Sequence, residues 1–185
     1  MMPSRLAEIS DVLRDVSARA EALGASLGAE QMLRRPEPNR WSPAECLAHL
    51  TITANAYAPV WRDAFAAARQ RGARGSEPYR MDFIGRMLNW SLAPGRFRYK
   101  TPAHMQPIGV ASGEAALAAF LDSQRMVQQF VVESAGLPLD RMKIASPAAA
   151  SIRYSVWSSF VIIGTHGQRH LAQAEAAAVT ASASR

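Results

Sequence analysis

The sequence has one cysteine and two lysines, and it has no apolar run long enough to cross a bilayer. Because Cys46 has no second cysteine to pair with, an internal disulfide is excluded and a reducing compartment is favoured. The most apolar stretch, YSVWSSFVIIG, is far shorter than the roughly 20 residues of a membrane helix. The polar N-terminal stretch MMPSRLAEISDVLRD lacks the apolar core of a secretory signal. We therefore expect a cytoplasmic protein without a membrane partner.

The charge is unevenly distributed, with 21 basic residues against 15 acidic ones and a net charge of +6. Between Arg69 and Lys100 the only acids are Glu77 and Asp82. The simplest interpretation of this basic segment is a solvated loop, although such a segment can also attract nucleic acid or a small anion. No predicted helix carries a basic stripe with interleaved aromatic residues, which makes nucleic acid an unlikely partner.

Sustained period-2 alternation, internal repeats and low-complexity linkers are also missing, whereas apolar residues recur at helical spacing in four long segments. These segments cover about residues 5–23, 42–69, 112–136 and 154–178. One short and two long connections join them, and residues 81–90 add a short helical candidate. We predict an all-α four-helix bundle with long loop connections, forming one domain over 1–185. Its core would span about 4–178, followed by a short disordered C-terminal tail.

The second long helix has the clearest start signal. Ser42 is a natural N-cap, Pro43 occupies the first helical position and Glu45 the third, which together form a capping box. Pro59 lies inside the same helix and should kink or split it, since proline removes a backbone hydrogen bond and clashes with the preceding turn.

Two of the four histidines, His166 and His170, are spaced so that they share one face of the last helix. Neutral imidazoles four residues apart can bind one metal ion, as in the HExxH zinc motif. Such pairs also occur on surfaces and in cores, so the spacing alone leaves both interpretations open. Ser155, Ser159 and Gln173 share this face, which predicts a polar pocket wall; Gln173 could hydrogen-bond an imidazole or be a solvated residue near the helix end.

A third ligand would complete a catalytic type of site. His49 lies two turns into the second helix, whereas His104 lies in the proline-bounded loop KTPAHMQP. A helix holds a ligand more rigidly than a loop, so we assign His49 and leave His104 outside the site. Glu45 is expected to cap the helix rather than support His49. Cys46 could act as a nucleophile, but a small packed residue is the simpler interpretation.

Three imidazoles on one divalent ion leave coordination positions open, which is typical of catalytic sites. Nitrogen ligands suit Zn, Ni or Fe, and sequence does not separate these metals. No Ser–His–Asp or Cys–His arrangement offers another mechanism.

Three motifs, RWSPAECLAHL, KTPAHMQP and HGQRHLAQAE, resemble the DinB superfamily, also called DinB/YfiT-like, and within it the subgroup with a WS-x-x-E-x-x-x-HL signature. They occur in the family's order and span about residues 5–178. The resemblance implies a DinB-like four-helix bundle with a metal held by His49, His166 and His170. For some members it also implies an activity, such as thiol-dependent S-transfer or isomerisation. A homodimer is a separate expectation.

From these features we expect a metal-dependent enzyme, either an S-transferase that uses a low-molecular-weight thiol or a hydrolase. The substrate would be a small molecule, such as an anionic thiol whose carboxylate binds Arg96 and Arg98 in the basic segment. The alternative is a non-catalytic metal- or ligand-binding bundle, dimeric and connected with a stress response.

Overall fold

The computed structural model describes residues 3–97 and 99–183, which are mostly helical. Four long helices form the body of the molecule, as the sequence predicts, and the all-α class is confirmed. They are α1 (Ser4–Ser26), α3 (Pro43–Gln70), α5 (Gly113–Glu133) and α6 (Val156–Ala183). Three short helices of the described residues lie between them: α2 (Ala29–Leu33), α4 (Phe83–Leu92) and the 3₁₀ helix η1 (Ala103–Met105).

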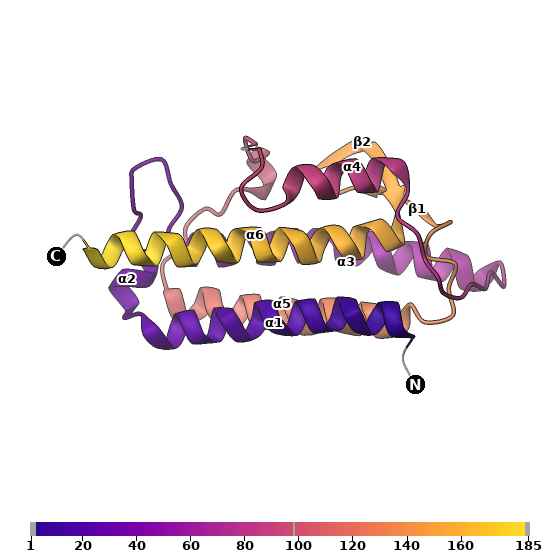
Figure 1. Cartoon of the computed structure of the whole chain (residues 1–185), viewed down its shortest axis with the longest axis horizontal. Helices are drawn as coiled ribbons and strands as arrows, with labels where there is room; N and C mark the ends of the chain where they lie inside the picture. Colours follow the sequence, from indigo (N-terminus) through magenta and orange to yellow (C-terminus); the bar gives the residue numbers. More distant parts are fainter. Residues whose placement is uncertain (1–2, 98, 184–185) are drawn as a thin grey trace.

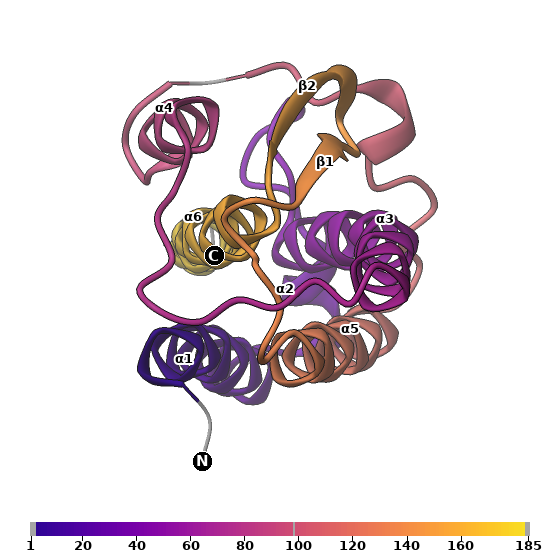
Figure 2. The same ribbon diagram turned by 90° about the vertical axis from the view of Figure 1, so that its right-hand side faces the viewer.

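The long helices form a four-cornered bundle in which α3 contacts α5 and α6, and α1 contacts the same two helices (Figure 2). The colour gradient in Figure 1 shows that α1 and α6 run in one direction while α3 and α5 run in the other. Because α3 and α5 are parallel, the chain between them has to travel back along the bundle. Helix α4 lies on this return path and packs against α6.

The buried apolar residues that the structure describes form two clusters, and both include residues of α3 and of the antiparallel α6. Trp61 is fully buried, stacks on Tyr57 with ring centroids 4.9 Å apart and donates from Nε1 to the Ser159 hydroxyl at 2.8 Å. Phe160 packs against the same indole at 5.1 Å. No helix in the described residues is long and apolar enough to cross a membrane.

The start of α3 has the predicted capping box. The Ser42 hydroxyl accepts from the Glu45 amide at 3.2 Å, and the Glu45 carboxylate accepts from the Ser42 amide at 2.9 Å. Arg35 donates to the same carboxylate at 2.8 Å, so Glu45 is occupied by the cap and by this arginine. Of the kink or split expected at Pro59, the split does not occur, because α3 continues through this residue. Pro59 has no N–H to donate to the Asn55 carbonyl one turn earlier in the helix. Both residues are exposed, so water can hydrogen-bond to that carbonyl instead.

Replacing Ser42 with alanine should lower the free energy of unfolding by about 1 kcal/mol, because the helix loses its N-cap. Ser17→Ala is the matched control, since the Ser17 hydroxyl donates to the Leu13 carbonyl within α1 and its loss should be near neutral. Urea denaturation of the three proteins measures both changes. Equal stability of the Ser42 variant and the parent would contradict the role of the cap.

The prediction that the second long connection is an irregular loop is wrong. Residues expected to be irregular form an antiparallel hairpin of β1 (Lys143–Ser146) and β2 (Ala149–Ser155). The strands are short and their register shifts between Ala145 and Ser146, so no sustained alternation marks them in the sequence. Tyr154 therefore belongs to a strand, although the predicted last helix began there. At its other end α6 continues to Ala183; residues 184–185 of the expected tail lie outside the described residues.

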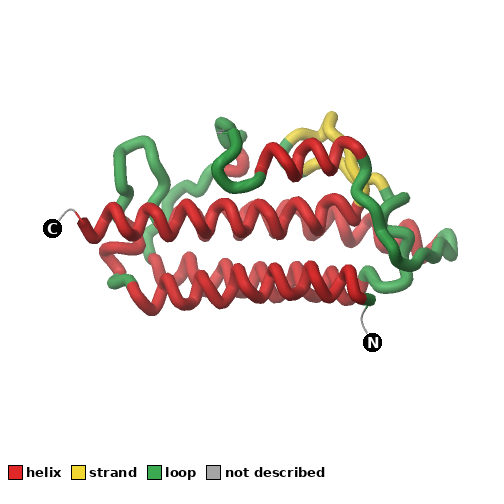
Figure 3. Tube along the Cα trace, in the orientation of Figure 1, coloured by secondary structure: helices red, strands yellow, loops and turns green. Residues whose placement is uncertain are grey.

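The hairpin, α4 and the loop after α4 lie together on one side of the bundle (Figure 3). Asp82 holds this layer in place. Its carboxylate caps α4 through the Gly85 amide at 2.7 Å, accepts from the Ser155 amide at 2.7 Å and binds Lys143 of β1. A Cβ on Gly85 would lie 2.2 Å from the Ser158 hydroxyl, so only glycine allows this close approach.

Candidate metal centre and pocket

Three imidazoles converge between α3 and α6. His49 comes from the first half of α3, and His166 and His170 come from the middle of α6, one turn apart. Because the two helices are antiparallel, these positions lie opposite one another. One ring nitrogen of each residue lies within 4.8 Å of the others. The structure thus brings together the three predicted residues as a group that could hold a metal ion.

A backbone carbonyl fixes the orientation of His49. Its Nδ1 lies 2.8 Å from the Met105 carbonyl oxygen, which can only accept, so Nδ1 carries the hydrogen. The lone pair is then on Nε2, which faces His166 Nε2 at 3.0 Å. A backbone partner of this kind commonly sets the tautomer of a metal-binding histidine. His49 is thereby prepared as a ligand.

The surroundings keep the three rings neutral. Burial lowers the pKa of His49, and burial together with the neighbouring His49 and Arg169 lowers the pKa of His166 to about 3. Burial, followed by the other two imidazoles, also holds the pKa of His170 well below its usual value. At neutral pH each ring therefore offers an unprotonated nitrogen.

The donor set fits a divalent ion. Nδ1 of His166 and Nδ1 of His170 are buried, and neither has a hydrogen-bond partner among the described residues. Two nitrogens bound to one ion at about 2.1 Å each lie roughly 3 Å apart, close to the separation of His49 Nε2 and His166 Nε2. The half-buried Trp41 covers one side of the cluster, with ring centroids 4.8 Å from His49 and 5.7 Å from His170. This apolar cover limits the access of water.

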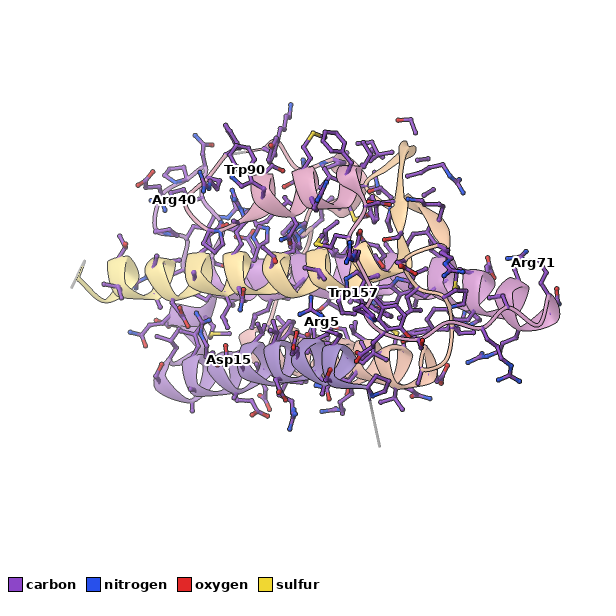
Figure 4. All side chains as sticks on the ribbon, turned by 45° about the vertical axis from the view of Figure 1, so that its right-hand side comes forward. Arg5, Asp15, Arg40, Arg71, Trp90 and Trp157 are labelled. Carbon is purple, nitrogen blue, oxygen red and sulfur yellow. The ribbon has the colours of Figure 1, made fainter. Side chains whose placement is uncertain are left out.

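A pocket of about 1170 Å³ opens beside the imidazoles. Its walls come from α3, α6, the segment from the end of α4 to η1, and the hairpin turn. Among the described residues that line it, none is acidic and four are cationic: Arg40, Arg96, Lys100 and Arg169. Figure 4 shows Arg40 and Trp90 on this side of the bundle, away from Asp15 of α1. The pocket is therefore complementary in charge to an anion.

Of the two arginines predicted to bind an anion, the structure describes one. Arg96 lines the pocket, and its guanidinium lies 4.9 Å from the centroid of the Trp90 ring. Arg98 lies outside the described residues. The expectation that Ser155 and Ser159 form a polar wall is wrong, because both are fully buried and hydrogen-bonded in the protein interior. Ile162 and Ile163 form that wall instead.

The other candidate residues of the sequence analysis are not part of the three-imidazole cluster. His104 is exposed, and its Nε2 lies 3.1 Å from the Pro147 carbonyl. Gln173 lines the pocket one turn beyond His170, and its contact with that imidazole opposes the lowering of the pKa. Cys46 is fully buried, and burial raises the pKa of its thiol to about 12, so it is not a nucleophile at neutral pH.

Arg169, between the two histidines of α6, is a functional candidate that sequence reasoning missed. Its guanidinium donates to the carbonyls of Leu92 and Ala93, at 3.4 and 3.2 Å, and to the carbonyl of Phe97. These carbonyls lie at the C-terminal end of α4 and in the loop that follows. The residue thus attaches the pocket wall to the helix that carries His166 and His170. The sequence gives no signal for these three hydrogen bonds, because their acceptors are backbone carbonyls, which every residue has.

Arg169→Met should loosen this wall while leaving the bundle folded, since methionine keeps much of the apolar stem. Trypsin should then cleave after Arg96 or Lys100 several times faster than in the parent. Arg86→Met is the control, because Arg86 is exposed on α4. Mass spectrometry of the early fragments identifies the cleavage sites, and unchanged cleavage rates would contradict the anchoring role.

Comparison with known proteins identifies a family. A family model described as the DinB superfamily matches residues 12–174. No curated protein and no solved structure matches the chain. The match covers most of the chain and includes all three imidazoles of the cluster.

Proposed function

The chain belongs to the DinB superfamily, and from this premise we propose that it is a metal-dependent enzyme in which His49, His166 and His170 hold one divalent ion. The observation that carries the proposal is the convergence of three neutral imidazoles at the wall of a large pocket. Three protein ligands leave open positions for a reactant, as in catalytic rather than structural sites.

Zn, Ni or Fe would suit the nitrogen ligands. When bound, the ion would polarise a substrate oxygen or lower the pKa of a thiol or of water. The protein supplies the remaining requirements. Met105 orients His49, Trp41 shields the cluster on one side, and Arg169 holds the pocket wall.

We propose as the reaction either thiol-dependent S-transfer or hydrolysis of a small molecule. The four cations and the absence of acids among the lining residues support an anionic reactant, for example a low-molecular-weight thiol with a carboxylate. Its carboxylate would lie near Arg96, and Arg98 stays a candidate from the sequence alone. A single domain, a homodimer and a cytoplasmic location remain predictions.

The first experiment is elemental analysis of protein purified without a histidine tag or added metal. The metal-loaded protein is then incubated with electrophiles and several carboxylated thiols, and products are followed by mass spectrometry. Stoichiometric metal and turnover are expected. Metal without turnover would favour the non-catalytic binding protein, and the absence of metal uptake would overturn the proposal.

Removal of the ion should leave the helical fold intact. The aromatic core around Trp61, Phe160 and Trp157 is fully buried and lies apart from the imidazoles, so folding does not depend on the site. A chelator is expected to lower the melting temperature by mass action and to leave the far-UV circular dichroism unchanged. Loss of helicity on chelation would indicate a structural ion instead.

A further inference from the structure

Two tyrosines meet where the pocket approaches the hairpin. Tyr57 comes from α3 and Tyr154 from β2, and their hydroxyl oxygens lie 2.5 Å apart. Both side chains are almost completely buried, with exposed fractions of 4% and 1%, and both line the pocket. Ser146, also a lining residue, hydrogen-bonds Tyr154 from β1. Residues distant in sequence thus place three hydroxyl groups together.

A count of hydrogens shows what this group lacks. Three hydroxyls carry three hydrogens, but two hydrogen bonds among them use only two, whichever group donates in each bond. Among the described residues that line the pocket, none is acidic. Burial also raises the pKa of both tyrosines, so they stay protonated. One O–H hydrogen is therefore not used within this group.

The tyrosines and the imidazoles lie at separate points along the pocket. Tyr57 follows His49 by two turns, which is roughly 12 Å along a helix. Thr53 lies between them on α3, and Ile162 and Ile163 face this stretch from α6. The two ends thus have different chemistry: nitrogen lone pairs at one and a hydroxyl donor at the other. The wall between them is largely apolar.

We propose that Tyr57 and Tyr154 form a second binding subsite, which holds an oxygen acceptor at the far end of an elongated substrate. The acceptor is a carboxylate or a carbonyl oxygen, because these groups accept the unused hydrogen without donating one. The middle of the substrate is an apolar chain, and its reacting end lies at the imidazoles. The inference rests on the proposed function in taking this pocket as the substrate site.

Two probes of equal length test the subsite in the zinc-loaded protein. Octanohydroxamate has a metal-binding group and a methyl end, whereas the monohydroxamate of octanedioic acid ends in a carboxylate. Isothermal calorimetry should show that the carboxylate-ended probe binds about tenfold or more tightly, as expected for a hydrogen bond to a charged group. The advantage should vanish for the monohydroxamate of butanedioic acid, which is too short.

The double variant Tyr57→Phe/Tyr154→Phe should abolish this advantage without weakening octanohydroxamate. Tyr79→Phe is the matched control, because Tyr79 is also buried but does not line the pocket. A tenfold advantage that persists in the double variant would show that the cationic rim supplies it, and would overturn the subsite.

A second readout does not depend on the metal. With 3-fluorotyrosine incorporated, octanedioate titrated into the metal-free protein should shift the ¹⁹F resonances of Tyr57 and Tyr154 and leave that of Tyr79 unchanged. The absence of such a shift would overturn the subsite even if the protein binds zinc. Failure of zinc binding with the shift retained would instead overturn the proposed function and leave the subsite standing.

Discussion

Replacing His166 with alanine is expected to weaken the binding of a divalent ion by more than about a hundredfold, whereas replacing His104 should leave it unchanged. Loss of an outer hydrogen-bond partner of a ligand alone costs roughly 10–100-fold in metal affinity, and removal of a ligand should cost more. His166 Nε2 lies 3.0 Å from His49 Nε2 within the cluster, whereas His104 is exposed on the hairpin side.

The measurement is a competition titration with a chromophoric chelator, using Zn²⁺ and Co²⁺. His49→Ala and His170→Ala should behave like His166→Ala, since the three rings contribute equivalent nitrogens. His104→Ala is the control that keeps all three. If His166→Ala and His104→Ala retained the ion equally, the assignment of the site would be wrong.

The two helices that carry the site could be predicted because their signals are local. The capping box at Ser42 and the helical spacing of apolar residues define α3, and the spacing of His166 and His170 sets one face of α6. The choice of His49 over His104 depended on one physical argument, the rigidity of a helix. That argument agrees with the observed convergence of the rings.

The walls of the pocket could not be predicted in the same way. Helix periodicity tells which residues share a face, but not which element covers that face. Ser159 shares a side of α6 with His166, yet Trp61 of α3 covers Ser159 and donates a hydrogen bond to its hydroxyl. Met105 acts through a backbone carbonyl, which any residue could provide. Tyr57 and Tyr154 are 97 positions apart and meet only through the hairpin, which the sequence did not reveal.

The metal-free protein should be less stable at pH 5 than at pH 7 because of its buried imidazoles. The folded protein lowers the pKa of His166 to about 3, while the unfolded chain has the ordinary value near 6.5. Below pH 6.5 the unfolded chain binds a proton at His166 that the folded protein does not bind. The contribution of His166 to the free energy of unfolding is therefore fully present above this pH and is lost as the pH falls toward 3. His166 is partly exposed to the pocket, so we expect it to contribute about 1–2 kcal/mol over this window. His170, with its pKa also lowered, acts in the same direction.

The pH window separates the histidines from the carboxylates. Burial tends to raise the pKa of Glu45 and of Asp82, but Arg35 and Lys143 respectively reverse this effect and lower both values below normal. Their stabilising contributions are therefore lost only in more acidic solution than pH 5. Urea denaturation at pH 7 and pH 5 should show a smaller pH effect in His166→Gln than in the parent. His104→Gln is the matched control, because His104 is exposed and lies outside the cluster. An undiminished pH effect in His166→Gln would show that His166 is protonated as readily in the folded state as in the unfolded chain, and that the cluster is not held neutral by burial.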